Sequence, residues 1–200
     1  MNFRTYLIAL ALALGACGQT ATPEAPLAGA RIGGPFTLVN QDGVQTTERD
    51  FAGRYRLMYF GYAYCPDICP VDLQKLMAGY ARLEKSDPAI AAKIAPIFVS
   101  IDPDRDKPAV LKQYVAAFHP KLIGLTGTPE QIAATAKTYA ILYSKEGEPG
   151  ASDYLMNHSR LAYLFGPSGD PTAKKRRGEL LTRPRALAQG YRCAVSLQPS

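Results

Sequence analysis

Cysteine is scarce in this sequence, with four in 200 residues. That density is far below what a disulfide-dense mini-scaffold needs. The composition, with 47% hydrophobic and 20% charged residues, is that of one globular domain long enough to bury a sizeable core. Histidine is scarcer still, at two residues, so a site that needs imidazole has few candidate ligands. The search for a thiol or metal site is therefore short.

The body of the chain also lacks an excess of charge. Residues 1–170 contain 16 Lys or Arg and 16 Asp or Glu, whereas residues 171–200 contain seven basic residues and one acidic residue, Glu179. The whole formal charge of +6 therefore lies at the C-terminal end. Nucleic-acid binding needs a basic surface on the folded domain, so we expect no nucleic-acid partner. We also find no phosphate-cradling glycine loop and no serine triad.

The N-terminus has the layout of an export signal. Arg4 gives a short positive region, and residues 6–16 form an apolar stretch that ends before Cys17 in the string LGAC. This stretch is shorter than the roughly 20 apolar residues that span a bilayer. It resembles a bacterial lipoprotein signal, which implies cleavage before Cys17 and a lipid on its thiol. An ordinary signal peptide cut after Ala16, or an uncleaved anchor, is the alternative.

The composition divides the chain into four segments. They are a lipoprotein-type signal peptide over residues 1–16, a flexible tether over 17–34, a folded domain over 35–169 and an atypical basic tail, expected to be disordered, over 170–200. The tether is predicted because Ala, Gly, Pro and Thr dominate it without any period. We expect the domain to face the periplasm of the bacterial cell envelope, held at the membrane by lipidated Cys17.

Strand-like and helix-like segments alternate within the domain. Continuous apolar runs indicate buried strands, apolar residues at helical spacing indicate helices, and turn residues 41–43 indicate an N-terminal hairpin. The expected strands are 56–62, 94–101 and 160–165, and the expected helices are one from Pro70, one over 107–118, and one from a Thr128 N-cap with a capping box to about 142. This alternation predicts an α/β fold with a central, mostly parallel sheet flanked by helices.

A cysteine pair, Cys65 and Cys69 in the string CPDIC, lies where the first long strand meets a helix. This position narrows the prediction to a thioredoxin-like arrangement. If the helix begins inside the loop, the thiols lie about one turn apart on one side, close enough to bind one metal ion or to form a disulfide. The helix N-terminus favours the thiolate, which is the form that binds metal. Metal binding, redox exchange and a structural disulfide all stay open. Tyr62 and Tyr64 flank the pair and either shield it from water or pack in the core.

Two histidines are candidates for a third ligand. His119 follows a predicted helix, where interaction with the helix dipole is the simpler interpretation. His158 directly precedes a predicted buried strand, and on spacing alone it is more often structural than a ligand. Two thiolates and one imidazole suit a soft ion such as copper(I), whereas zinc normally needs a fourth ligand. The acidic string DPDRD, residues 102–106, fits a turn before a helix better than a hard-cation site.

Four longer motifs follow one another along residues 35–169: YFGYAYCPDICP, VSIDPDRDKP, LIGLTGTPEQIAATAKTYAILYSK and YLMNHSRLAYLFGPSG. In this order and at these separations they resemble the SCO/SenC family of copper chaperones for cytochrome c oxidase assembly. The resemblance implies a thioredoxin-like fold with a hairpin insertion before the ligand histidine, and copper held by Cys65, Cys69 and His158. It also implies copper delivery to, or reduction of the cysteines of, the binuclear copper site of oxidase subunit II. Other copper chaperones or thioredoxin-like reductants are the further partners it implies.

Two features depart from that family. Many members have Asp before the histidine, whereas this chain has Asn157; copper binding should survive the change, and transfer is the step it puts in question. After about Gly169 the sequence looks divergent or frameshifted, with four consecutive basic residues and Pro184 where members have a further strand and helix. We therefore expect the strand at 160–165 to lose its neighbour, which would destabilise the domain or promote association. Cys193 has no assigned role.

Two other functions would use the same cysteines. The chain could be a thiol–disulfide oxidoreductase for which copper is incidental, with Cys65 and Cys69 as its catalytic residues, or a copper or redox sensor without a delivery role. His158 discriminates between metal and thiol chemistry, because dithiol exchange needs no distant third ligand. Our main interpretation is a metallochaperone, with thiol–disulfide reductase activity as an additional possibility.

Overall fold

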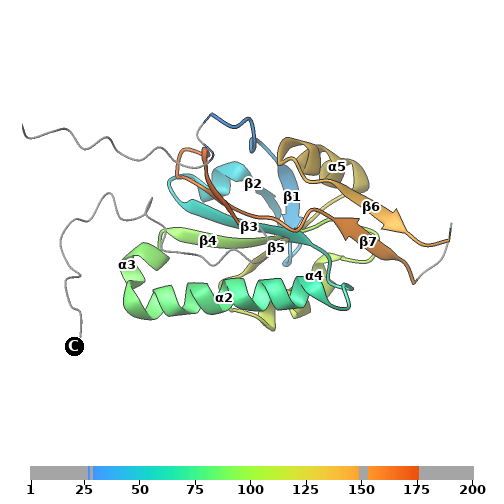
Figure 1. The fold of residues 1–200 in the computed structure, drawn as a ribbon, viewed down its shortest axis with the longest axis horizontal. Helices are drawn as coiled ribbons and strands as arrows, with labels where there is room; N and C mark the ends of the chain where they lie inside the picture. Colours follow the sequence, from blue (N-terminus) through green and yellow to red (C-terminus); the bar gives the residue numbers. More distant parts are fainter. Residues whose placement is uncertain (1–26, 28, 149–152, 176–200) are drawn as a thin grey trace, which may run out of the picture. The chain divides into compact units, whose positions relative to one another are not determined.

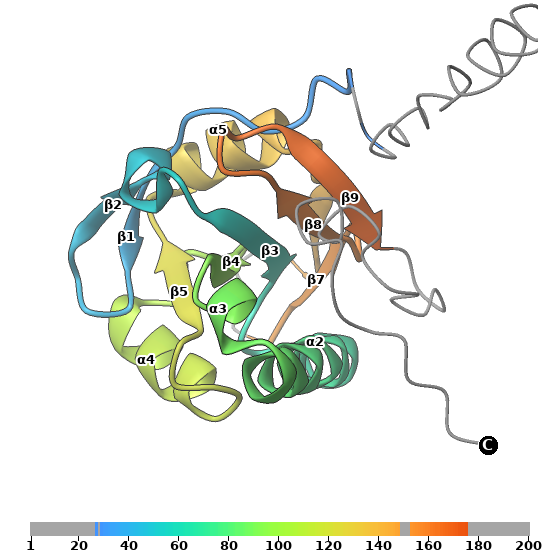
Figure 2. The same ribbon diagram turned by 90° about the vertical axis from the view of Figure 1, so that its left-hand side faces the viewer.

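The computed structural model of the protein describes residues 27, 29–148 and 153–175. A seven-stranded sheet in the order β2-β1-β5-β4-β3-β8-β9 forms its centre. Its strands are β1 (Thr37–Asn40), β2 (Gln45–Thr47), β3 (Tyr55–Gly61), β4 (Ile94–Ser100), β5 (Ile123–Thr126), β8 (Ala162–Phe165) and β9 (Pro171–Lys175). The helices are η1 (Glu48–Phe51), α2 (Ile68–Ser86), α3 (Pro88–Ala91), α4 (Pro108–Ala116) and α5 (Pro129–Thr138). Helices α2 and α4 cover one face of the sheet and α5 covers the other (Figures 1 and 2).

The three central strands, β3, β4 and β5, run parallel to one another. Every residue of β4 is buried, because helices pack on both faces of the sheet, and this explains the continuous apolar run in the sequence. The outer pairs, β1 with β5 and β3 with β8, are antiparallel. The predicted α/β fold, with a parallel centre flanked by helices, is confirmed.

The three predicted helices begin within two residues of their predicted starts. Thr128 accepts a hydrogen bond from the Gln131 amide and completes the predicted capping box of α5. This helix ends at Thr138 rather than near residue 142, because Ala140 adopts a left-handed backbone with φ of 52°. In α2, the buried residues Cys69, Leu73, Leu76, Met77 and Tyr80 lie on one face at helical spacing.

A separate two-stranded sheet carries the second histidine. Its strands, β6 (Tyr143–Glu146) and β7 (Leu155–His158), form the hairpin insertion that the family resemblance implied. Tyr143 pairs with His158 at the base of this hairpin, and the Ser159 amide donates to the Leu142 carbonyl at 2.8 Å. In Figure 1 the hairpin extends from the end of the main sheet that lies next to the start of α2.

The strand at 160–165 has a neighbour on each side, so our expectation that it loses one is wrong. β9 pairs antiparallel with β8, opposite the edge that contacts β3. A tight turn makes this possible: Gly169 adopts a φ of 97°, and the Gly166 amide donates to the Asp170 carbonyl at 2.7 Å. The strand was not predicted because its sequence, PTAKK, is polar and contains no apolar run. Lysine is nevertheless common on edge strands.

Two residues of the segment predicted as a tether contact the folded domain. Ile32, within the predicted tether, packs against the hydrophobic core, and the Gly33 amide donates to the Thr138 carbonyl at 3.0 Å. The signal peptide, Cys17 and Cys193 lie outside the described residues. Within the described part of the chain, no helix is both long and apolar enough to cross a membrane.

Candidate metal centre

The two motif cysteines lie where β3 leads into α2. Cys65 is half-buried in the connecting loop, and Cys69 is fully buried in the first turn of the helix, 0% exposed. Both thiols are free, and the Cys69 amide donates to the Cys65 sulfur at 3.4 Å. Gly61 makes room for the deeper thiol, because a Cβ at this position would lie 2.9 Å from the Cys69 Sγ. This requirement for glycine was not predicted from the sequence.

His158 reaches the cysteines from the end of β7. Its Nε2 lies 3.3 Å from the Cys69 Sγ, and its Nδ1 lies 3.1 Å from the Ser159 carbonyl oxygen. A carbonyl can only accept, so we assign the ring hydrogen to Nδ1, which leaves the Nε2 lone pair directed at Cys69. Burial lowers the pKa of His158 and favours the neutral imidazole, the form that binds metal.

The surroundings shift the two thiol pKa values in opposite directions. Burial alone would raise the pKa of Cys65, but hydrogen bonds from the amides of Cys69, Asp67 and Ile68 outweigh it, and the net pKa is lowered. Burial raises the pKa of Cys69 to about 12. Cys65 is therefore the thiol that ionises first. Cys69 keeps its proton near neutral pH unless a bound metal ion displaces it.

A pocket of about 240 Å³ opens above the site. The ring of Tyr62 forms one wall and meets the His158 ring edge-on, with centroids 6.1 Å apart. Tyr62 is therefore the residue that shields the site, whereas Tyr64 is 54% exposed. The polar and ionisable residues that line the pocket are Tyr62, Cys65, Asp67, Glu146, Asn157, His158 and Arg160.

The three predicted ligands lie around the same pocket, but their side chains are not arranged around a single ion position. Cys69 and His158 are in contact, and Cys65 lines the same pocket as His158. As the side chains lie, no three His, Cys, Asp or Glu groups among the described residues are placed to hold one ion. The donor set of two sulfurs and one imidazole matches a soft ion.

The other histidine belongs to a different part of the molecule. His119 Nε2 lies 2.9 Å from a Glu84 carboxylate oxygen, its Nδ1 accepts from the Lys121 amide, and its ring packs edge-on against Tyr80. Glu84 and Tyr80 lie in the second half of α2, several turns from Cys69. His119 therefore holds the end of α4 against α2, a structural role as the sequence indicated, with Glu84 as its partner.

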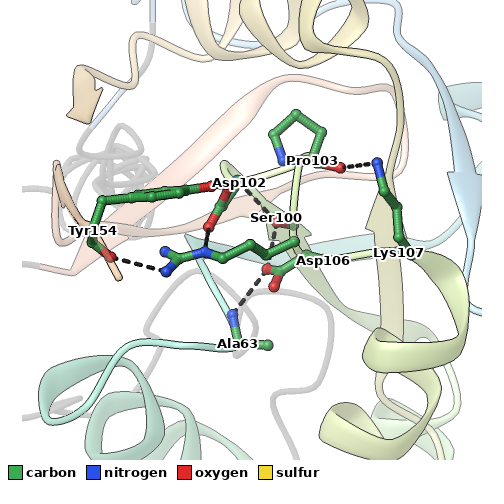
Figure 3. Close-up of polar contacts among 8 residues, drawn as sticks. Ala63, Ser100, Asp102, Pro103, Asp106, Lys107 and Tyr154 are labelled. Carbon is green, nitrogen blue, oxygen red and sulfur yellow. Dashed lines mark hydrogen bonds and ion pairs between the residues drawn. The ribbon is translucent and has the colours of Figure 1, made fainter. Parts of the chain in front are cut away.

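The acidic turn at residues 102–106 is occupied by internal hydrogen bonds rather than arranged as a cation site. Asp106 is fully buried, and its Oδ2 accepts from the Ala63 amide at 2.9 Å and from the Ser100 hydroxyl at 2.6 Å (Figure 3). Asp102 accepts from the Tyr154 hydroxyl at 2.7 Å and pairs with Arg105 at 2.6 Å. Burial raises the pKa of Asp106 to about 6. The acidic side chains of this turn therefore hold the Ala63 backbone and Tyr154 in place. The spacing of the residues in the sequence does not predict these contacts.

Comparison with known sequences identifies one family. The model of the SCO1/SenC family matches residues 24–191, a longer span than the four motifs indicated. The mitochondrial SCO1 homolog 1 of Arabidopsis thaliana is 45% identical over 148 residues, covering 74% of this chain and 43% of the relative. SenC of Rhodobacter capsulatus is 43% identical over 140 residues, covering 70% of this chain and 61% of the relative. The chain spans about half the length of the curated relatives that it matches.

Solved structures show the same similarity. Copper-bound ScoI of Arabidopsis thaliana has a TM-score of 0.69 at 39% identity and covers 80% of this chain and 94% of that one. Copper-bound ScoI of Bradyrhizobium japonicum has a TM-score of 0.67 at 35% identity, covering 80% and 96%. BsSco, with a TM-score of 0.54 at 26% identity and coverage of 70% and 80%, is described as containing a disulfide switch and as a member of the Sco family of cytochrome c oxidase assembly proteins.

Proposed function

This chain belongs to the SCO1/SenC family, and from that premise we propose that it is a copper-binding metallochaperone whose ion is held by Cys65, Cys69 and His158. The contact of 3.3 Å between Cys69 Sγ and His158 Nε2, from positions 89 residues apart, is the observation that carries the proposal. The two copper-bound relatives support the choice of ion. Soft thiolate ligands and a neutral imidazole favour copper(I) in particular.

The opposed properties of the two thiols suit capture and release. Cys65 lines the open pocket and has the lowered pKa, so it is the first sulfur that an incoming ion meets as a thiolate. Cys69 is fully buried, and the half-buried His158 lines the pocket beside Cys65. The half-buried Cys65, at the pocket, is also the sulfur from which ligand exchange with a partner's thiols would begin.

The finer parts of the proposal concern place and partner. We infer that copper is delivered to, or cysteines are reduced in, the binuclear copper site of cytochrome c oxidase subunit II, in line with the oxidase-assembly role of the related BsSco. Export to the cell envelope and a lipid on Cys17 rest on the sequence of residues 1–17. Other copper chaperones or thioredoxin-like reductants are the expected sources of copper or electrons.

The test is copper(I) titration of the full chain, reduced and anaerobic, in detergent. We expect one ion per chain with thiolate-to-copper absorption, lost in Cys65→Ala and in Cys69→Ala. His158→Ala should weaken binding, while the matched variant His119→Ala should leave it unchanged. Near-unit binding retained by either cysteine variant would refute the site.

A second candidate function is thiol–disulfide exchange by the same cysteines. The free thiols, their opposed pKa shifts and the disulfide switch described for BsSco favour it. If His158→Ala preserved oxidase assembly in cells while Cys65→Ala abolished it, thiol exchange would be the function and copper would be incidental. Loss of assembly in both variants would support the metallochaperone.

A further inference from the structure

The hairpin that carries His158 is not part of the main sheet. β6 and β7 pair only with each other among the described strands, and the hairpin meets the rest of the domain through side chains and its base. After His158, Arg160 donates to Asp72 of α2 at 3.0 Å. The position of His158 relative to the cysteines therefore depends on a small number of side-chain contacts.

Arg105 makes the densest set of these contacts, from the turn between β4 and α4. Its Nε lies 2.6 Å from Asp102 Oδ2, and its Nη1 donates to the Tyr154 carbonyl at 2.9 Å. The Arg105 guanidinium carbon also lies 3.6 Å from the centroid of the Tyr154 ring. The Tyr154 hydroxyl donates to Asp102; both residues are labelled in Figure 3. Tyr154 immediately precedes β7, the strand that ends at His158.

The same guanidinium contacts the segment that leads to Cys65. Its central carbon lies 5.1 Å from the ring centroid of Tyr64 and 5.7 Å from that of Tyr62. Tyr62 in turn meets the His158 ring edge-on. Asp106, the next residue along, accepts from the Ala63 amide, so the 102–106 turn contacts both the cysteine loop and the histidine hairpin.

We propose that Arg105 is a positioning residue that sets the distance between the 65–69 loop and His158. Asp102 is 2% exposed and the Arg105 side chain 18%, so the pair is held in a dry, fixed geometry. A planar guanidinium can bond to the carboxylate, donate to the Tyr154 carbonyl and lie over aromatic rings at once, whereas an ammonium group cannot. The consequence for copper rests on the function proposed above; the placement of the hairpin does not.

The copper-independent test is alkylation of Cys69 by iodoacetamide in the reduced full chain, followed by peptide mass mapping. Arg105→Gln should free the hairpin and speed this reaction roughly ten- to hundredfold, the range that loss of one charge-assisted hydrogen bond allows. Tyr154→Phe, which removes only a hydroxyl, should act in the same direction and guards against misfolding of the first variant. Lys145→Met is the matched control, because Lys145 Nζ also lies 3.6 Å from the Tyr154 ring but belongs to the hairpin itself.

Hydrogen exchange on the same variants separates positioning from general destabilisation. We expect faster exchange in β7 and unchanged exchange in the central strand β4. An unchanged Cys69 alkylation rate in both Arg105→Gln and Tyr154→Phe would overturn the proposal, and so would acceleration of β4 to the same extent as β7.

A double-mutant cycle then tests the link to copper. If Arg105 acts through His158, then Arg105→Gln combined with His158→Ala should bind copper(I) no more weakly than His158→Ala alone. Independent, multiplying losses of affinity would overturn the link. Failure of the unaltered chain to bind copper would count against the proposed function, while the alkylation rates would still decide the role of Arg105.

Discussion

Arg160 and Asp72 form an ion pair with 3.0 Å between Nη2 and Oδ2, which joins the chain just after His158 to the first part of α2. Both side chains are about a quarter exposed, at 23% and 28%, so solvent screens the pair only in part. Arg160 also lines the pocket at the candidate site, so the pair ties this part of the pocket to α2. Its removal gives the first prediction.

Asp72→Asn should weaken copper(I) binding severalfold while lowering stability by only about 1 kcal/mol, the upper range for a partly exposed pair. The reason is that the chain after His158 loses its tie to α2. Competition titration and urea unfolding measure the two effects. Arg49→Gln is the control, because the Arg49 side chain, beside Glu48, is 90% exposed and should change neither. A loss of stability without a loss of affinity would contradict the role given to the pair.

Gly61→Ala should cost about 1–3 kcal/mol of stability, the usual cost of an added methyl group in a packed core. The new Cβ would lie 2.9 Å from Cys69 Sγ and 3.1 Å from the Tyr59 ring, so the sulfur would have to shift from its position against His158 Nε2. Copper affinity should fall as well. Gly79→Ala, in the same helix as Cys69, is the matched control: its nearest neighbour would be an Arg82 nitrogen at 3.8 Å, and alanine favours helix. Equal effects of the two substitutions on urea unfolding would argue against the crowding.

Asp106 should make the free energy of unfolding fall as the pH rises from about 4 to about 6. Burial raises its folded-state pKa to about 6, above the ordinary value of 3.8, so the folded state holds the proton more tightly in that window. Its stability contribution is greatest below pH 4 and is lost by pH 6, a change of about 3 kcal/mol at most. The lowered pKa of His158 acts with the opposite sign, so the measurement is the difference between the urea midpoints of the unaltered chain and Asp106→Asn across pH 4–7. A constant difference would contradict the assignment.

Copper affinity should rise with pH, by about tenfold per unit for each proton released. The pKa of Cys69 is raised to about 12, so binding near neutral pH has to displace at least its proton. Competition with a copper(I) chelator of known pH response, between pH 6 and 8, measures the slope. An affinity independent of pH over this range would mean that Cys69 is not a ligand, since its thiol would then keep its proton.

Much of the fold could be predicted from periodicity, because the central strands and helices bury continuous or evenly spaced apolar residues. The exceptions are short elements of mixed composition. β5, with the sequence IGLT, lies between a helix and a capping box and has too few residues to show a period. β9 consists of the polar string PTAKK, and its pairing depends on the turn at Gly169 rather than on apolar side chains.

The site was only partly predictable for a different reason. Cys65 and Cys69 are four positions apart on either side of the start of α2, so their closeness in the sequence keeps them near each other. The family motif was needed to identify His158. Arg105 and Tyr154 are separated by 49 positions, and only the placement of the hairpin makes them neighbours. A contact that depends on the position of an inserted hairpin produces no periodic pattern or fixed spacing in the sequence.

The separation of the β6–β7 hairpin from the main sheet has a kinetic consequence. An outward movement of His158 would break no ladder hydrogen bond of the seven-stranded sheet, because β7 pairs only with β6 among the described strands. An ion bound at the site would then rest on two sulfurs, open on the third side to a competing pair of thiols. If the chain carries copper as proposed, the dissociation rate would follow the motion of this hairpin and not the unfolding of the protein, so the chain could hold its ion in isolation and release it quickly on encounter with a partner.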